Sequence, residues 1–236
     1  LNSSDTNRTL HIVADRNNTD AVGLSQVNIS AAVSFNGDIT LISTGNDTIG
    51  PDRVLVNATV TSTANLIIVS AQRDAIVGAS GSLSAPTGGK SISMTADSDI
   101  TSGGTLTLNN NVTITGGAGS ITLQGGTINQ AAGTVDAGTG TISIDSNDNG
   151  VTLSGTVTSS NVGTALTIKD TSTVTFAGSI TLSNSAATFA LGVDGGGNEV
   201  TGTIDQTAGA ITVEGTTSII ADGNVSLTQS TNDFGT

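Results

Sequence analysis

Short apolar–polar–apolar triplets recur along the chain at spacings of 20 to 29 residues. Because successive side chains of an extended strand point to opposite faces, each triplet predicts a short strand with two side chains in a core. Self-similarity at a period of this length is typical of solenoids. The nine triplets begin at Leu10, Ile39, Leu66, Ile92, Ile121, Ile142, Leu166, Leu191 and Ile211.

Further strand-like pieces follow the triplets within each period. After the triplet at Ile142 come Val151-Thr152-Leu153 and Val157, and glycine pairs such as Gly116-Gly117 supply turns. Two or three strands per turn predict an all-β fold, a right-handed parallel β-helix of about nine coils. Repeats of a β-sandwich are the alternative, because they also show short strands at regular spacing. In the β-helix we expect one inward stack of Ile121, Ile142, Leu166, Leu191 and Ile211.

No linker divides the chain, so residues 1–236 are predicted to form a single β-solenoid segment. Residues 1–90 are less regular and rich in glycosylation sequons, whereas residues 91–236 carry the regular coils. Neither end resembles a cap, and uncovered end strands favour association. The segment is therefore expected to belong to a longer chain or to stack on other copies.

Composition excludes several classes of protein. The chain has no cysteine, tryptophan or tyrosine and only four phenylalanines, so its core must come from Val, Ile, Leu and Ala. Its net charge of −13 argues against nucleic acids and anionic membranes, which select for clustered Lys and Arg. Its apolar runs are far shorter than a membrane span requires.

Several stretches resemble one known family. The run Gly223–Thr236, Gly119-Ser120-Ile121-Thr122-Leu123 and Gly178-Ser179-Ile180-Thr181-Leu182 are similar to repeats of the filamentous-haemagglutinin-like proteins, giant bacterial cell-surface β-helix proteins of the adhesin family. The resemblance covers most of residues 90–236. It implies a β-helical stalk of an exported adhesin, and it brings no catalytic residues with it.

Catalysis is not expected from this composition. Polysaccharide-active β-helix enzymes, the minor alternative, use clustered acids with Lys or Arg and aromatic platforms for sugars. Here the single histidine, His11, lies within a triplet and is expected to face outward. The pair Asp145 and Asp148 lies on a predicted turn, where Asp caps backbone amides.

A weak calcium signal lies on that same turn. Asp145-Ser146-Asn147-Asp148-Asn149-Gly150 matches the opening of a calcium loop, in which oxygen ligands alternate before a glycine. The twelfth position is Thr156 instead of Glu, so an Asx-rich corner without metal is the favoured interpretation. If a metal binds, Asp145, Asn147 and Asn149 are its first ligands, and no other cofactor is expected.

Triplet register suggests a ladder of charges. Asp145, Asp194 and Glu214 each follow a triplet directly, and Lys169 takes the equivalent place between the first two. We therefore expect all four at one corner, where the lysine, or a bound cation, relieves repulsion between stacked carboxylates.

Eight N-glycosylation sequons are present, and six fall within the first 57 residues. Ser and Thr are so common that the total carries little weight, but the cluster indicates a sugar-decorated N-terminal part. The candidate asparagines are Asn2, Asn7, Asn17, Asn28, Asn46 and Asn57.

Together these features predict a structural or adhesive scaffold of a secreted cell-surface protein, the stalk of a large adhesin. The alternative is a self-stacking subunit of an extracellular filament or surface layer. The expected partners are other copies or flanking repeats at the open solenoid ends, and cell-surface glycans or proteins. Nucleic acid and membrane insertion are not expected.

Overall fold

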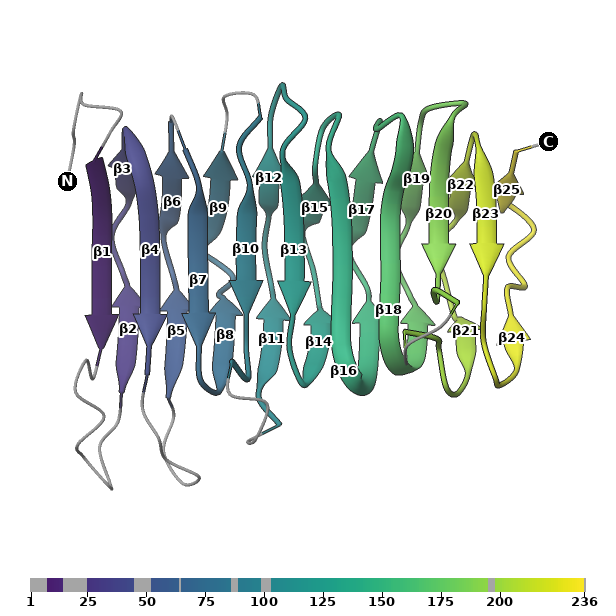
Figure 1. The fold of residues 1–236 in the computed structure, drawn as a ribbon, viewed down its shortest axis with the longest axis horizontal. Helices are drawn as coiled ribbons and strands as arrows, with labels where there is room; N and C mark the ends of the chain where they lie inside the picture. Colours follow the sequence, from purple (N-terminus) through teal and green to yellow (C-terminus); the bar gives the residue numbers. More distant parts are fainter. Residues whose placement is uncertain are drawn as a thin grey trace.

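The computed structural model describes residues 8–14, 25–44, 52–63, 65–85, 89–98, 103–194 and 198–235. Over these ranges every element is a β-strand and every strand pairing is parallel. In Figure 1 the near strands run downward and the far strands run upward while the chain advances from left to right, which is a right-handed coil. The β-helix prediction is confirmed, and the antiparallel β-sandwich is wrong.

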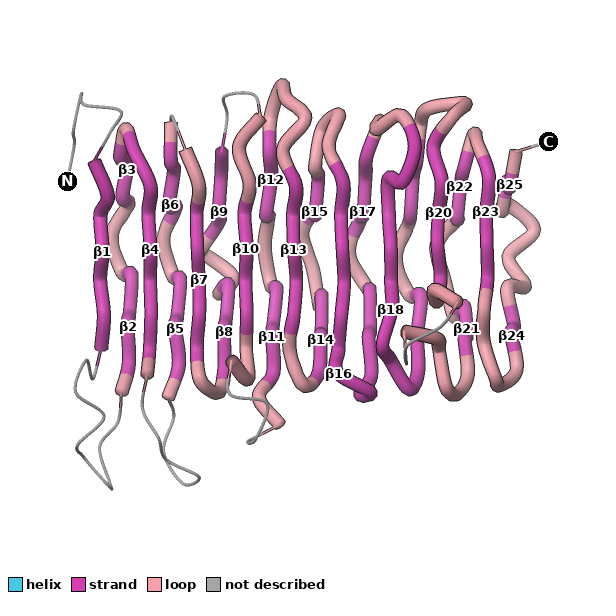
Figure 2. Tube along the Cα trace, in the orientation of Figure 1, coloured by secondary structure: helices cyan, strands magenta, loops and turns pink. Residues whose placement is uncertain are grey.

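The coil has three faces, and we call each turn of three strands a rung, numbered 1 to 9 (Figure 2). Face one contains β1 (Arg8–Ala14), β4 (Gly37–Ser43), β7 (Ile67–Ala71), β10 (Ile92–Thr95), β13 (Ser120–Gln124), the first parts of β16 (Thr141–Leu153) and β18 (Gly163–Phe176), β20 (Ala187–Leu191) and β23 (Thr216–Ile219). Face two contains β2 (Gln26–Ile29), β5 (Arg53–Val56), β8 (Asp74–Val77), β11 (Thr105–Leu108), β14 (Thr127–Gln130), the last parts of β16 and β18, β21 (Ile204–Gln206) and β24 (Val225–Ser226). Face three contains β3 (Val33–Phe35), β6 (Thr59–Ser62), β9 (Ser82–Ala85), β12 (Val112–Ile114), β15 (Thr134–Asp136), β17 (Thr156–Ser159), β19 (Ile180–Leu182), β22 (Ile211–Val213) and β25 (Asp233–Phe234).

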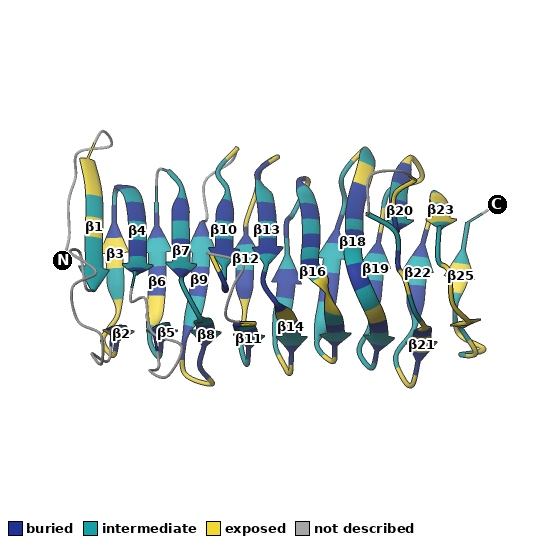
Figure 3. Cartoon of the chain, turned by 60° about the horizontal axis from the view of Figure 1, so that its bottom comes forward, coloured by how far each residue is buried: buried dark blue, intermediate teal, exposed yellow. Residues whose placement is uncertain are grey.

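Alternation within each strand builds the core. Inward side chains are buried and outward ones are half-buried or exposed, which gives the banded strands of Figure 3. Because rungs pair in register, inward side chains stack into columns along the axis. The first column of face one contains Leu10, Ile39, Ile67, Ile92, Ile121, Ile142, Leu166, Phe189 and Thr217.

The predicted stack of five residues is only partly right. Ile121, Ile142 and Leu166 share a column, but Leu191 lies in the neighbouring column, opposite Ile168. Ile211 lies on face three, opposite Ile180. All three faces carry similar triplets, so the spacing alone does not show which face a triplet occupies.

Two phenylalanines modify the expected aliphatic core. Phe176 and Phe189 are fully buried, and their rings meet edge to face with centroids 6.1 Å apart. They come from faces two and one, so they fill the interior where rungs 7 and 8 meet. The residues that the structure describes include no helix long and apolar enough to span a bilayer.

Candidate functional site

A cluster of charged side chains lies where β16 and β18 turn from face one to face two. We call Asp145, Asp148, Lys169 and Asp170 the acidic corner. Asn147, Asp148 and Asp170 have φ of 47°, 61° and 49°, a left-handed conformation that Asn and Asp tolerate better than most residues. The chain therefore turns a tight corner, where the register between β16 and β18 shifts from Asp145 to Gly150, and pairing is regular on either side.

Lysine and aspartate pair across neighbouring rungs at this corner. Asp145 and Lys169 are register partners, and the Lys169 Nζ lies 3.6 Å from Asp145 Oδ2. The expectation that Asp145 and Lys169 share one corner is confirmed.

The two other members of the predicted ladder lie elsewhere. Since Leu191 pairs with Ile168, the position next to Lys169 belongs to Gly192, and Asp194 is two residues further on. Glu214 follows Val213 on face three, so it belongs to a different corner. Both predictions are wrong for the reason that applies to Leu191 and Ile211: similar triplets occur on all three faces, so the spacing does not show which corner follows a triplet.

The three predicted calcium ligands lie together on one turn, and their polar atoms already make local hydrogen bonds. The Asn147 backbone N–H donates to Asp145 Oδ1 at 3.3 Å, and Asn149 Nδ2 donates to the Asn147 carbonyl at 3.0 Å. The Asn149 carbonyl accepts from Ser146 Oγ at 2.8 Å and from Thr171 Oγ1 at 2.6 Å. These bonds are typical of an Asx-rich corner, in which side chains and backbone groups of the same turn satisfy one another.

Among the described residues no group of three or more His, Cys, Asp or Glu is placed to hold a metal. Calcium binding stays a prediction, and calorimetry of the purified chain with millimolar calcium tests it. Heat that Asp145→Asn abolishes would support the site, whereas no heat and an unchanged melting temperature would support the Asx-rich corner.

Sequence reasoning missed Asp170 as a member of this corner. Burial raises the pKa of the Asp170 carboxyl, and the carboxylates of Asp145 and Asp148 raise that pKa further. A hydrogen bond with the Asp148 side chain also raises the pKa, and the Lys169 charge lowers it. The missed signal was the residue after Lys169, which the triplet register already placed at this corner.

Of the six glycosylation candidates, Asn28 and Asn57 lie in described parts of the chain. They occupy adjacent rungs, and Asn57 Nδ2 donates to Asn28 Oδ1 at 3.4 Å. Two glycans on side chains this close would collide, so we expect at most one to be modified. Asn2, Asn7, Asn17 and Asn46 lie outside the described residues.

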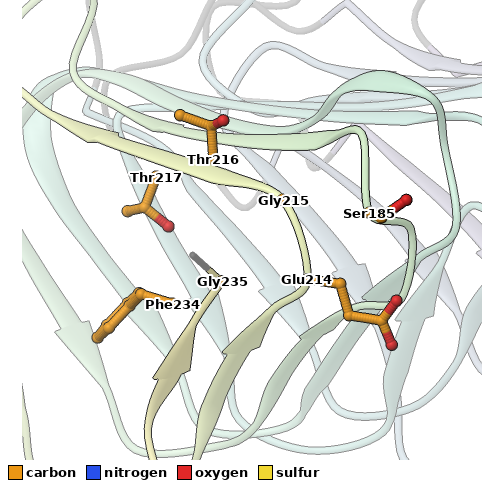
Figure 4. A pocket seen from close by; sticks show the side chains of 7 residues that line it. All are labelled: Ser185, Glu214, Gly215, Thr216, Thr217, Phe234 and Gly235. Atoms are coloured by element: carbon orange, nitrogen blue, oxygen red, sulfur yellow. The ribbon is translucent and has the colours of Figure 1, made fainter.

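His11 faces outward, as expected, and is exposed in the middle of β1. A hollow with a volume of about 370 Å³ lies at the opposite end of the coil from His11, on rung 9. Figure 4 shows its lining, which mixes hydroxyl, carboxylate and aromatic groups from Ser185, Glu214, Gly215, Thr216, Thr217, Phe234 and Gly235.

An amide pair formed by the buried Gln206 and the half-buried Asn232 joins rungs 8 and 9. Gln206 Nε2 donates to Asn232 Oδ1 at 2.9 Å, and Asn232 Nδ2 donates back to Gln206 Oε1 at 2.7 Å. Gln206 Nε2 also donates to the Gly209 carbonyl at 2.7 Å. Gln130 Nε2 donates to the Gly133 carbonyl in the same way. The sequence Gln-x-Ala-Gly, which occurs at both corners, could have predicted this buried glutamine.

These features define the chain as a repeat protein of the parallel β-helix class. Residues 193–236, which form rungs 8 and 9 in part, match a family model described as repeats of unknown function (DUF5649). Comparisons with curated proteins and with solved structures find no match.

Proposed function

We propose that the chain is a β-helical scaffold, a stalk segment of a secreted cell-surface protein. The observation that supports this proposal is the continuous register of nine rungs around one core. At the usual strand spacing such a stack is a rod on the order of 40 Å long. Each rung contacts only its neighbours, so the length of the rod follows the number of rungs.

The surface chemistry of the rod supports a role in reach and spacing. A net charge of −13 keeps neighbouring rods apart laterally. The resemblance to filamentous-haemagglutinin-like proteins supports the more particular version, a stalk of an adhesin. In this version the ligand contacts lie in other parts of a longer polypeptide.

Changing the number of rungs tests the scaffold role directly. Ser120 pairs with Thr141, so a duplication of the 21 residues 120–140 adds one rung in register. Small-angle scattering should then show a rod longer by about 4.8 Å with an unchanged cross-section. A matched control inserts 21 Gly and Ser residues after Gly140, which adds mass without adding a rung.

Localisation tests the second part of the proposal. Immunogold labelling of the native protein should mark thin rods or filaments outside the cell. A compact cytoplasmic particle would overturn the proposal, as would reproducible glycan cleavage that an Asp substitution abolishes.

A further inference from the structure

Two asparagines in this chain stand directly before a glycine, in the pairs Asn36-Gly37 and Asn149-Gly150. In such a pair the backbone nitrogen of the glycine can attack the side-chain amide carbon, Cγ, of the asparagine. Glycine has no Cβ to obstruct the approach, and its backbone reaches conformations that other residues avoid. The attack still requires the two atoms to come within about 3–3.5 Å of each other in a suitable orientation, so the local structure decides which pair reacts.

The Asn149-Gly150 pair lies where the backbone ladder is irregular. Asn149 is exposed, and the register between β16 and β18 shifts on both sides of it. The space beside the glycine is open as well, because among the described residues a Cβ built on Gly150 would meet only Thr173 Oγ1, at 3.1 Å. An exposed side chain on an irregular turn has the conformational freedom that the attack requires.

Two hydroxyl groups also favour the reactive form of the attacking nitrogen. This nitrogen must first lose its proton, and the resulting negative charge is shared with the carbonyl oxygen of the same peptide group. That oxygen belongs to Asn149, and it accepts hydrogen bonds from Ser146 Oγ at 2.8 Å and from Thr171 Oγ1 at 2.6 Å. Each hydroxyl lies closer to this oxygen than to its second acceptor. Donors that are fixed at the atom where charge develops stabilise that charge, as in an oxyanion hole.

The charged groups of the acidic corner act on the same nitrogen. The carboxylates of Asp145, Asp148 and Asp170 oppose a further negative charge, whereas Lys169 lies 3.6 Å from Asp145 and offsets part of this repulsion. Salt screens charges that act through solvent more than it weakens direct hydrogen bonds from the two hydroxyls. The reaction should therefore become faster as pH rises, because the nitrogen is deprotonated more often, and faster as salt is added.

The Asn36-Gly37 pair has the same two residues in a setting that hinders the attack. Gly37 is buried at the start of β4, and the pairing of β4 with β1 is regular from Arg8 and Gly37 onward. A Cβ built on Gly37 would overlap the Arg8 carbonyl oxygen, so the backbone of the neighbouring rung lies directly against this glycine. The Asn36 side chain is also held, because its Oδ1 accepts a hydrogen bond from Thr63 Oγ1 at 3.0 Å. This pair is therefore an internal control for the other.

We propose that Asn149 is a modification site, at which the folded chain deamidates through attack of the Gly150 nitrogen. This nitrogen gives up its proton and forms a bond to Asn149 Cγ, and the bond between Cγ and Nδ2 breaks. Nδ2 leaves as ammonia and takes up the proton that the ring closure released. Water, the co-reactant, then opens the succinimide ring at either carbonyl carbon. Opening at one carbon yields aspartate and opening at the other yields isoaspartate, and nothing is oxidised or reduced.

Either product changes the acidic corner. Aspartate or isoaspartate at position 149 adds a negative charge beside Asp148, in a corner that already holds the carboxylates of Asp145 and Asp170. Isoaspartate also lengthens the backbone by one carbon between the two parts of β16. We therefore expect modified chains to melt at a lower temperature than unmodified ones. The reaction is a property of the corner, and it does not depend on the scaffold function proposed above.

Peptide mapping by mass spectrometry tests the proposal on the unaltered 236-residue chain. The folded protein is kept in mildly alkaline buffer for several weeks, and samples are digested at acidic pH, where the reaction is slow. The peptide with Asn149 should gain the mass difference between OH and NH2, and electron-transfer fragmentation should identify isoaspartate in the product. Asn36 should react roughly tenfold more slowly in the folded chain and at a similar rate in denaturant. Equal rates in the folded chain, or an Asn149 that reacts only in denaturant, would overturn the proposal.

Thr171→Val tests the role of the hydroxyl donors, because valine has nearly the same shape as threonine and lacks the hydroxyl. Deamidation of Asn149 should slow by roughly tenfold, less than the loss of a donor costs in the oxyanion hole of an enzyme. Ser146→Ala removes the other donor and should act in the same direction. Thr152→Val, an outward change on the same strand, is the matched control and should leave the rate unchanged. Melting temperatures establish that the variants are folded, and an unchanged or faster reaction in folded Thr171→Val and Ser146→Ala would overturn the role of the two hydroxyls.

Discussion

Asp170 is the residue at which the charge of the acidic corner is least favourable. Its pKa lies above the ordinary value of 3.8, so the folded protein holds the Asp170 proton more tightly than the unfolded chain does. Ionisation of Asp170 therefore opposes folding. This destabilising effect is present at neutral pH and disappears as the pH falls through the raised pKa.

Asp170→Asn should raise the melting temperature at pH 7. The gain over the unaltered chain should shrink as the pH falls toward 3.8, because both states of Asp170 are then increasingly protonated. Asn also tolerates the φ of 49°, so the substitution adds no backbone strain. Thermal melts at several pH values check this. Asp205→Asn, at an exposed position on β21, removes the same charge away from the corner and is the matched control.

Lys169 supplies the opposite charge at the corner. The lysine and Asp145 side chains are 34% and 17% exposed, so their ion pair is worth about 0.5–1 kcal/mol. Lys169→Met should lower stability by about that amount at low salt and by less at high salt. Denaturant titrations at two salt concentrations measure it.

Lys90→Met is the matched control for this change. The Lys90 Nζ donates to the neutral Asn65 Oδ1 at 3.1 Å. Its effect should therefore vary little with salt. A salt dependence equal to that of Lys169→Met would contradict a specific role for the corner.

At the scale of elements, corner glycines set how closely rungs approach. A Cβ on Gly140 would overlap the carbonyl oxygen of Gly119 on the preceding rung, whereas one on Gly116 meets nothing within 4 Å. Gly140→Ala should cost about 3 kcal/mol through overpacking. Gly116→Ala should cost about 1 kcal/mol, because Gly116 has φ of 78°. Chemical denaturation compares them, and equal losses would contradict this difference in mechanism.

The amide pair between rungs 8 and 9 should behave as a unit. Gln206→Leu or Asn232→Val alone leaves the other amide without its side-chain partner, and each should cost about 1–3 kcal/mol. The double variant removes both amides, so it should cost less than the sum of the single losses. A double-mutant cycle measures the coupling, and strict additivity would contradict it.

The periodicity of apolar residues was sufficient to predict the strands and their parallel stacking, because the two-residue alternation is a local property. It was not sufficient to predict the phase of every strand. In Leu66-Ile67-Ile68-Val69 all four residues are apolar, so the alternation does not show which pair faces inward. The predicted triplet begins at Leu66, whereas Ile67 and Val69 are the buried pair. The acidic corner was half-predicted for a related reason. The spacing of the triplets was enough to predict that Asp145 and Lys169 are neighbours on adjacent rungs. The burial of the Asp170 carboxyl depends on how the corner folds, which the spacing does not show.

At the scale of the whole molecule, stability follows the order of the rungs. Each rung of a solenoid is stabilised by its two neighbours, so a rung with one neighbour opens most readily. Among the described residues, the inward side chains of rung 9 are half-buried or exposed, whereas those of rungs 4 to 7 are buried. The strands β24 and β25 of rung 9 have two residues each. Local opening should therefore begin at residues 216–235.

Hydrogen exchange measured peptide by peptide should resolve this gradient. Rungs 4 to 7 should be protected to the level of global unfolding, and residues 216–235 should exchange fastest at low protein concentration. Uniform protection from rung 4 to rung 9 in dilute monomer would contradict the nearest-neighbour picture, since the last rung would then need a source of stability other than rung 8.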